Sequence, residues 1–166
     1  FQLRNLQTND VIAFNVTQKS ANVFEGTAQL GASKLTRTME IQPETEAIRT
    51  KLVIQGVSAE FPGVSVNIPE KTVPHESGNF LIPTLEHQEL MAIHSGTTDR
   101  LNSSASEDKI SQTYSAVSLA GIGNQYFASA IVDKSEIIPE VRLTGGKKEA
   151  EMLVQMQYRP TAGKDT

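Results

Sequence analysis

The sequence predicts an all-β protein folded as an antiparallel β-sandwich, and three observations support this. Apolar and polar residues alternate with a period of two in several short segments, which is the pattern of half-buried strands. Gly and Pro interrupt the chain at short intervals. No segment has the sustained apolar repeat of a long amphipathic helix. Many short strands with frequent turns are typical of a sandwich.

The clearest strand pair is Leu35–Ile41 and Ile48–Ile54, in which apolar and polar residues alternate, and Pro43 presets the turn between them. β-branched and aromatic residues predict further strands. These are Val11–Thr17, Val23–Gln29, Val64–Ile68, Glu89–His94, Lys109–Ser115, Gln125–Val132, Val141–Leu143 and Met152–Tyr158. Turns are predicted at Gly31, Pro62-Gly63, Ser77-Gly78-Asn79, Gly121-Ile122-Gly123 and Gly145-Gly146. The polar segment Asp99–Asp108 is predicted to be a surface loop, and residues 147–154 fit either a short helix or a hairpin.

The most distinctive stretch is Asn124–Val132. It contains Tyr126 and Phe127, two of the few aromatic residues in a chain with three Tyr, six Phe and no Trp. Small residues and a β-branched pair follow them. Large side chains that fill a core, next to small ones that allow close packing, predict a buried strand. Phe127→Ala is therefore predicted to leave a cavity and to cost about 3–5 kcal/mol of stability.

Length and composition indicate a single soluble domain spanning residues 1–166. The chain has no Cys, so neither a disulfide framework nor a thiolate metal site is available. A net charge of −4 disfavours nucleic acid as a partner, because phosphates attract basic surfaces. The uncharged stretch Ile110–Val132 is long enough for a membrane span, but its many polar residues and its glycines favour two strands joined by a turn. Because the chain begins at Phe1, we expect it to be a piece of a longer protein.

A search for catalytic and ligand-binding patterns finds none. The sequence has no nucleophile elbow, phosphate loop or dinucleotide fingerprint. The histidines lack the spacing of metal ligands and are interpreted as surface residues: His75, His87 and His94. The carboxylate pairs are interpreted as solvated: Glu86 with Glu89, Glu107 with Asp108, and Glu149 with Glu151. Lys147-Lys148 is interpreted as a charged hairpin tip. The sequence thus predicts no catalytic, cofactor-binding or metal-binding residue.

One stretch carries a family resemblance. Tyr126-Phe127-Ala128-Ser129-Ala130 resembles the Tyr-Phe-Ala-x-Ala run near the end of the periplasmic domain of the YidC family of bacterial membrane-protein insertases. Leu35–Gly56 looks like that family's strand pair, and Tyr158–Asp165 is similar to its closing segment. The chain departs from the family pattern at three places: Leu119 stands for a Trp, Asp133 for a Pro, and Gly163-Lys164-Asp165 lacks the family's Pro.

The resemblance implies a β-supersandwich of the galactose-mutarotase type on the periplasmic face of the bacterial inner membrane. It implies a non-enzymatic accessory and docking domain of an insertase that helps inner-membrane proteins insert and fold, alone or with the Sec translocon. The implied partners are Sec subunits and nascent membrane proteins, and the implied membrane attachment is through helices outside this chain. Two alternatives stay open: a carbohydrate-binding or carbohydrate-active sandwich, and a surface that accepts a peptide strand on an exposed sheet edge.

Overall fold

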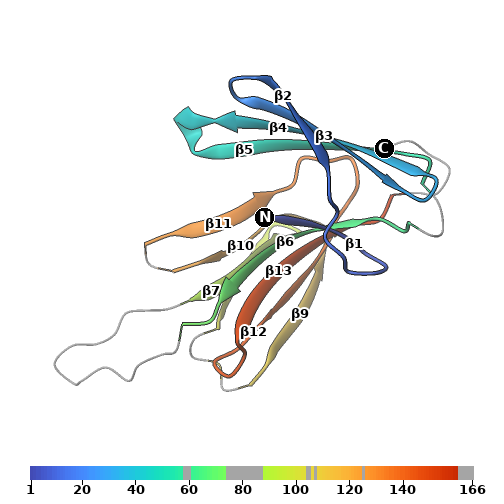
Figure 1. Cartoon of the computed structure of the whole chain (residues 1–166). Coiled ribbons are helices and arrows are strands. Elements are labelled where there is room, and N and C mark those ends of the chain that lie inside the picture. Colours follow the sequence, from blue (N-terminus) through green and yellow to red (C-terminus); the bar gives the residue numbers. More distant parts are fainter. Residues whose placement is uncertain (58–60, 74–87, 104–105, 107, 125, 161–166) are drawn as a thin grey trace. The chain divides into compact units, whose positions relative to one another are not determined.

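The computed structural model describes residues 1–57, 61–73, 88–103, 106, 108–124 and 126–160, and Figure 1 shows it as a cartoon. Within these ranges the chain is built of strands and one 3-10 helix, η1 (Pro43–Thr45). The strands are β1 (Gln2–Asn5), β2 (Asn15–Ser20), β3 (Val23–Leu30), β4 (Ser33–Gln42), β5 (Ala47–Gln55), β6 (Val64–Lys71), β7 (Glu89–His94), β8 (Thr97–Asn102), β9 (Ile110–Ser115), β10 (Val117–Gly123), β11 (Ala128–Val132), β12 (Glu140–Gly145) and β13 (Glu151–Tyr158). The predicted all-β class is confirmed.

The chain forms two compact units, and the one built mainly from Arg4–Val64 is a four-stranded antiparallel meander. Its strand order is β2-β3-β4-β5, and Leu35 lies opposite Ile54 in the pairing of β4 with β5. Both of these side chains are buried. The predicted turn at Pro43 is η1, and Glu46 closes it in the left-handed conformation with a φ of 52°. The predicted strand pair is confirmed.

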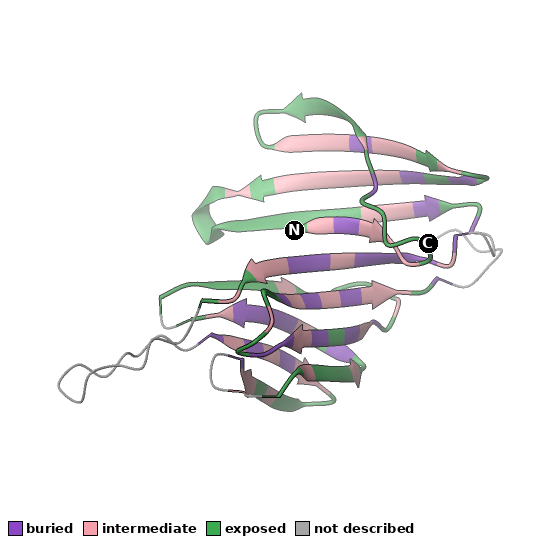
Figure 2. Cartoon of the chain, turned by 60° about the horizontal axis from the view of Figure 1, so that its bottom comes forward, coloured by how far each residue is buried: buried purple, intermediate pink, exposed green. Residues whose placement is uncertain are grey.

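The other unit, Phe1–Leu3 with Ser65–Tyr158, is a sandwich of two sheets. One sheet has the order β1-β6-β13-β12-β9 and the other the order β11-β10-β7-β8. Apolar side chains from both sheets form the buried core, and Figure 2 marks buried positions in purple. The core residues are Ile68, Leu90, Ala92, Val117, Ala120, Ile122, Val141, Leu143, Met152, Val154 and Met156.

Two sequence predictions about connections are wrong. The stretch Ile110–Val132 forms three strands rather than two, and Gly121-Ile122-Gly123 lies within β10 rather than in a turn. The reason is a close approach between neighbouring strands: a Cβ on Gly121 would lie 2.8 Å from the backbone oxygen of Ser129 on β11. Gly is needed there for space, not for turning.

The predicted loop Asp99–Asp108 is wrong in its first part, because Asp99–Asn102 belongs to β8. Pairing with β7 stabilises this polar segment along its whole length, and Arg100 reaches Glu89 of β7 at 3.6 Å. Residues 147–154 form the turn of the β12–β13 hairpin and the first half of β13, and a hairpin is one of the two predicted forms. The predicted turn at Ser77-Gly78-Asn79 lies outside the described residues. None of the helical structure in the described ranges is long and apolar enough to cross a bilayer.

Candidate functional site

The aromatic pair at the start of β11 lies on the surface. Tyr126 is 73% exposed and Phe127 is 80% exposed, so the prediction that they belong to a buried strand is wrong. The strand begins only at Ala128, and both aromatics lie in the connection from β10. The adjacent part of the core is instead filled by Ala120 and Ile122 of β10. Contiguous exposed apolar patches mark interaction surfaces, whereas single exposed apolar side chains are common on protein surfaces.

Asn124 fixes the backbone that carries the two aromatics. Its Oδ1 accepts hydrogen bonds from the backbone N–H groups of Tyr126 and Phe127, each at 2.8 Å. Its own N–H donates to the Phe127 carbonyl, also at 2.8 Å. An Asn side chain that binds backbone groups further along the chain is a standard device for ordering a turn. Three hydrogen bonds thus join Asn124 to the backbone of Tyr126 and Phe127, although both aromatic rings are exposed.

β11 follows as the edge strand of its sheet, and it pairs with β10 from Ala128 opposite Gly123 to Val132 opposite Leu119 without a register shift. All of its residues are exposed except Ile131, which is half-buried. The strand carries no charge and most of its exposed side chains are apolar. We call Tyr126, Phe127 and Ala128–Val132 together the β11 surface.

The other edge strands in the described part of the chain have protective features that β11 lacks. Natural sheets discourage unwanted pairing by placing charges on their edges. β9 has no charge, but its exposed side chains are all polar. The remaining four edges carry charged residues: Arg4 on β1, Lys19 on β2, Arg49 and Lys51 on β5, and Asp99 and Arg100 on β8. β11 therefore stands out as an apolar edge without a charge.

A second set of hydrogen bonds holds the chain just after β11. The Oδ1 of Asp133 accepts from the Tyr158 hydroxyl at 3.0 Å and from the Ser135 hydroxyl at 2.9 Å. The Asp133 N–H donates to the Ser118 carbonyl at 2.9 Å. Burial raises the pKa of Tyr158 well above its usual range, and the charge and hydrogen bond of Asp133 raise it further. Both ends of β11 are thus held by polar contacts.

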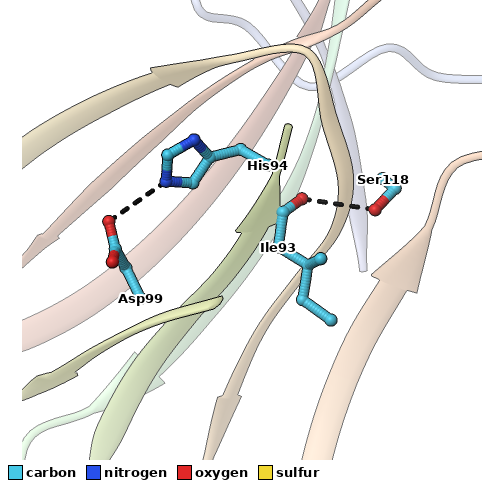
Figure 3. Close-up of polar contacts among 4 residues, drawn as sticks. All are labelled: Ile93, His94, Asp99 and Ser118. Atoms are coloured by element: carbon cyan, nitrogen blue, oxygen red, sulfur yellow. Dashed lines mark hydrogen bonds and ion pairs between the residues drawn. The ribbon is translucent and has the colours of Figure 1, made fainter. Parts of the chain in front are cut away.

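His94 is the one predicted surface histidine within the described residues, and it forms a cluster with Asp99 and Tyr114. Figure 3 shows its imidazole facing Asp99. Its Nε2 lies 3.1 Å from Asp99 Oδ2, and its ring centroid lies 4.6 Å from that of Tyr114. Burial raises the pKa of Tyr114, and Asp99 raises it further. The three residues come from β7, β8 and β9, so they connect one sheet of the sandwich to the other.

The His94–Asp99 pair has the geometry that orients a general base. The Ser118 hydroxyl, also drawn in Figure 3, is not placed to be its nucleophile. Ser118 donates to the Ile93 carbonyl at 3.3 Å. It lies on the opposite side of β7 from the imidazole (Figure 3). The contacts of this cluster are those of a structural link between the sheets.

The other His, Asp, Glu and Lys residues considered in the sequence analysis do not gather into a site within the described residues. Glu89 pairs with Arg100 at 3.6 Å, and Glu149 pairs with Lys109 at 3.2 Å. Within the described ranges, no group of three or more His, Asp or Glu side chains could hold a metal ion. Lys147-Lys148 lies in the β12–β13 turn, as predicted. Asp108 and Glu151 are exposed, as predicted, and four candidates fall outside the described residues: His75, His87, Glu86 and Glu107.

Sequence reasoning missed the β11 surface, because the absence of charge from Ile110 to Val132 is also what a buried segment shows. No family model, curated protein or solved structure matches the chain.

Proposed function

We propose that this chain is a non-enzymatic docking domain that binds other proteins through the β11 surface. The observation that carries the proposal is the exposure of Tyr126 and Phe127, whose backbone is hydrogen-bonded to Asn124, beside an uncharged apolar edge. Aromatic side chains are enriched, and charged ones depleted, at the centres of protein interfaces. The hydrogen bonds of Asn124 to the backbone of Tyr126 and Phe127 also lower the conformational entropy that these two residues lose on binding.

The resemblance to the YidC family makes the proposal more specific. In that reading, the domain is an accessory part of a membrane-protein insertase at the periplasmic face of the bacterial inner membrane. Its partners are Sec translocon subunits and nascent membrane proteins. The residues that carry the resemblance, from Tyr126 to Ala130, form much of the β11 surface. The segment that carries the family resemblance is therefore also the segment that binds the partner in this proposal.

The carbohydrate alternative has less support. Exposed aromatic rings can stack on sugars, and Tyr126 and Phe127 are exposed. Sugar recognition also needs polar side chains that hydrogen-bond the hydroxyl groups beside the ring. Asn124 Oδ1 is already occupied by two backbone N–H groups, and the exposed strand that follows supplies mainly Ala and Val side chains. A hexose titration that shifted the amide resonances of the turn would support this alternative instead.

Site-specific photo-crosslinking in bacteria tests the proposed function. Benzoylphenylalanine at position 127 keeps an aromatic ring on the turn. The same group at Val16 is a matched control, because Val16 is 56% exposed on another edge strand, β2. We expect crosslinks to Sec subunits or nascent membrane proteins from position 127 and not from position 16. Equal yields of those partners from both positions, or none from position 127, would refute the proposal.

A further inference from the structure

We infer that β11 binds its partner by strand addition: an uncharged, extended segment of the partner protein pairs with the free edge of β11 beside the Tyr126–Phe127 turn. This inference rests on the proposed docking function and deepens it, because it specifies the chemistry of the bound segment and the backbone groups that hold it. Three features of the structure carry it.

The first feature is the direction of the backbone groups on β11. The Asn124 N–H bonds the Phe127 carbonyl at one end of the hairpin, and the Asp133 N–H bonds the Ser118 carbonyl at the other. Hydrogen-bonded and non-bonded pairs alternate along an antiparallel ladder. Because Phe127 and Asp133 are both hydrogen-bonded to β10, every second residue between them has its N–H and C=O directed away from β10.

The residues with outward backbone groups are Ala128, Ala130 and Val132. All three are exposed, and none has a hydrogen bond to another segment among the described residues. Three consecutive sites of this kind match a partner strand of about five residues, since each strand residue spans about 3.3 Å. Main-chain hydrogen bonds of this type give affinity in known cases of strand addition.

The second feature is the absence of charge. The sequence has no charged residue from Ile110 through Val132, and the first charges after β11 are Asp133 and Lys134. A charged partner side chain would lose water at this edge without gaining an ion pair. The small side chains of Ala128 and Ala130 leave room for a neighbouring strand. The matching segment is therefore uncharged, with apolar or hydroxyl side chains.

The third feature is the set of hydrogen bonds at both ends of the strand. The turn bonds of Asn124 hold one end, and the bonds of Asp133 to Tyr158 and Ser135 hold the other. An edge that is already extended and held loses little entropy when a strand pairs with it. The β11 edge is therefore preorganised for binding.

A second copy of this chain fits the edge less well. The antiparallel register that uses all three outward residues of both copies places Ala130 opposite Ala130. The same register then places Phe127 opposite Asp133 of the other copy, because both lie three residues from the centre. That pairing sets an apolar ring against a carboxylate. Adsorption to a lipid surface would leave the outward N–H and C=O groups without strand partners, and the net charge of −4 gives no attraction to anionic headgroups.

The test uses the whole chain and an acetylated, amidated six-residue peptide of alternating Thr and Val. Binding is followed by amide chemical-shift titration. Ala130→Pro removes one outward N–H, and it leaves the ladder to β10 in place because that N–H does not bond β10. Ala130→Ser keeps the N–H and is the matched control. We expect Ala130→Pro to weaken binding at least about tenfold and Ala130→Ser to change it less than about twofold.

Thermal melting of each variant checks that it is folded. If Ala130→Pro does not fold, Ala130→Lys takes its place, because a charge on an edge strand opposes pairing. We expect Ala130→Lys to weaken peptide binding at least about fivefold.

Three results would overturn the inference. The first is no saturable shift with up to about 5 mM peptide. The second is equal binding by wild type and by the folded test variant, Ala130→Pro or its replacement Ala130→Lys. The third is a concentration-dependent dimer that Ala130→Pro abolishes, which would make a second copy the occupant. If the peptide test fails but crosslinking from position 127 is retained, the proposed docking function stands and the partner binds in another way. Peptide binding without Sec or nascent-chain crosslinks refutes the proposed function alone.

Discussion

Phe127→Ala separates a surface role for the aromatic turn from a core role. Phe127 is 80% exposed, so only about a fifth of its side chain is buried. A fully buried aromatic side chain removes about 150–250 Å² from water, so the buried part is about 40 Å². At about 25 cal/mol per Å², the substitution costs at most about 1 kcal/mol. This replaces the about 3–5 kcal/mol that a core position would give.

The assay is urea unfolding followed by circular dichroism, with two controls from buried positions. Leu143 lies in the core of the same unit and is 0% exposed. We expect Leu143→Ala to lower the free energy of unfolding by about 2–5 kcal/mol. Phe61→Ala repeats the chemical change at a side chain that is 1% exposed, and we expect about 3–5 kcal/mol. Phe127→Ala should shift the midpoint far less than either control.

The reasoning would be refuted if Phe127→Ala cost as much as Phe61→Ala, because the ring would then be packed in solution. A second measurement on the same variant links stability to function. Phe127→Ala should reduce peptide binding while the chain stays folded. Leu143→Ala should instead reduce both the stability of the fold and peptide binding.

Three more predictions concern packing, a buried hydrogen bond and alkaline pH. Gly121→Ala should cost about 1–3 kcal/mol in urea unfolding, because its Cβ would press on the β11 backbone. Ser103→Ala should cost about 1–3 kcal/mol by calorimetry, since the buried Gly146 N–H loses its acceptor. The native pKa of Tyr158 is raised, so above pH 10.0 the unfolded chain loses this proton first and stability falls, by at most about 1.4 kcal/mol per pH unit; Tyr158→Phe should flatten that fall in alkaline urea titrations.

Several predicted strands match the structure, although the first five residues of β5 are exposed on both faces of the strand. β4 and β5 match the alternation in Leu35–Ile41 and Ile48–Ile54, and β7 has the predicted bounds Glu89–His94. β8 was missed because its residues are polar, and only its pairing with β7 makes it a strand. β10 was missed because its glycines signal a turn in sequence, although they serve close packing in the structure.

The β11 surface could not be predicted because an edge strand and a central strand can have the same composition. Tyr126 and Phe127 next to small and β-branched residues are typical of a core, and local sequence does not tell where a strand lies in its sheet. That position is set by the order β11-β10-β7-β8, which depends on contacts far apart in the chain. The uncharged character of the segment was visible, but uncharged residues suit a core and a docking edge equally.

The strand orders β2-β3-β4-β5 and β1-β6-β13-β12-β9 have a consequence for synthesis on the ribosome. The meander β2-β3-β4-β5 joins only consecutive strands, so each hairpin can form as soon as its second strand has emerged. β6 instead lies next to β13, the last strand of the described chain, and must wait for it. At about 5–20 residues per second, the 80 residues from Lys71 to Glu151 take roughly 4–16 s to appear. During that interval β6 exposes an open edge. We therefore expect a holding chaperone to bind the nascent chain at β6.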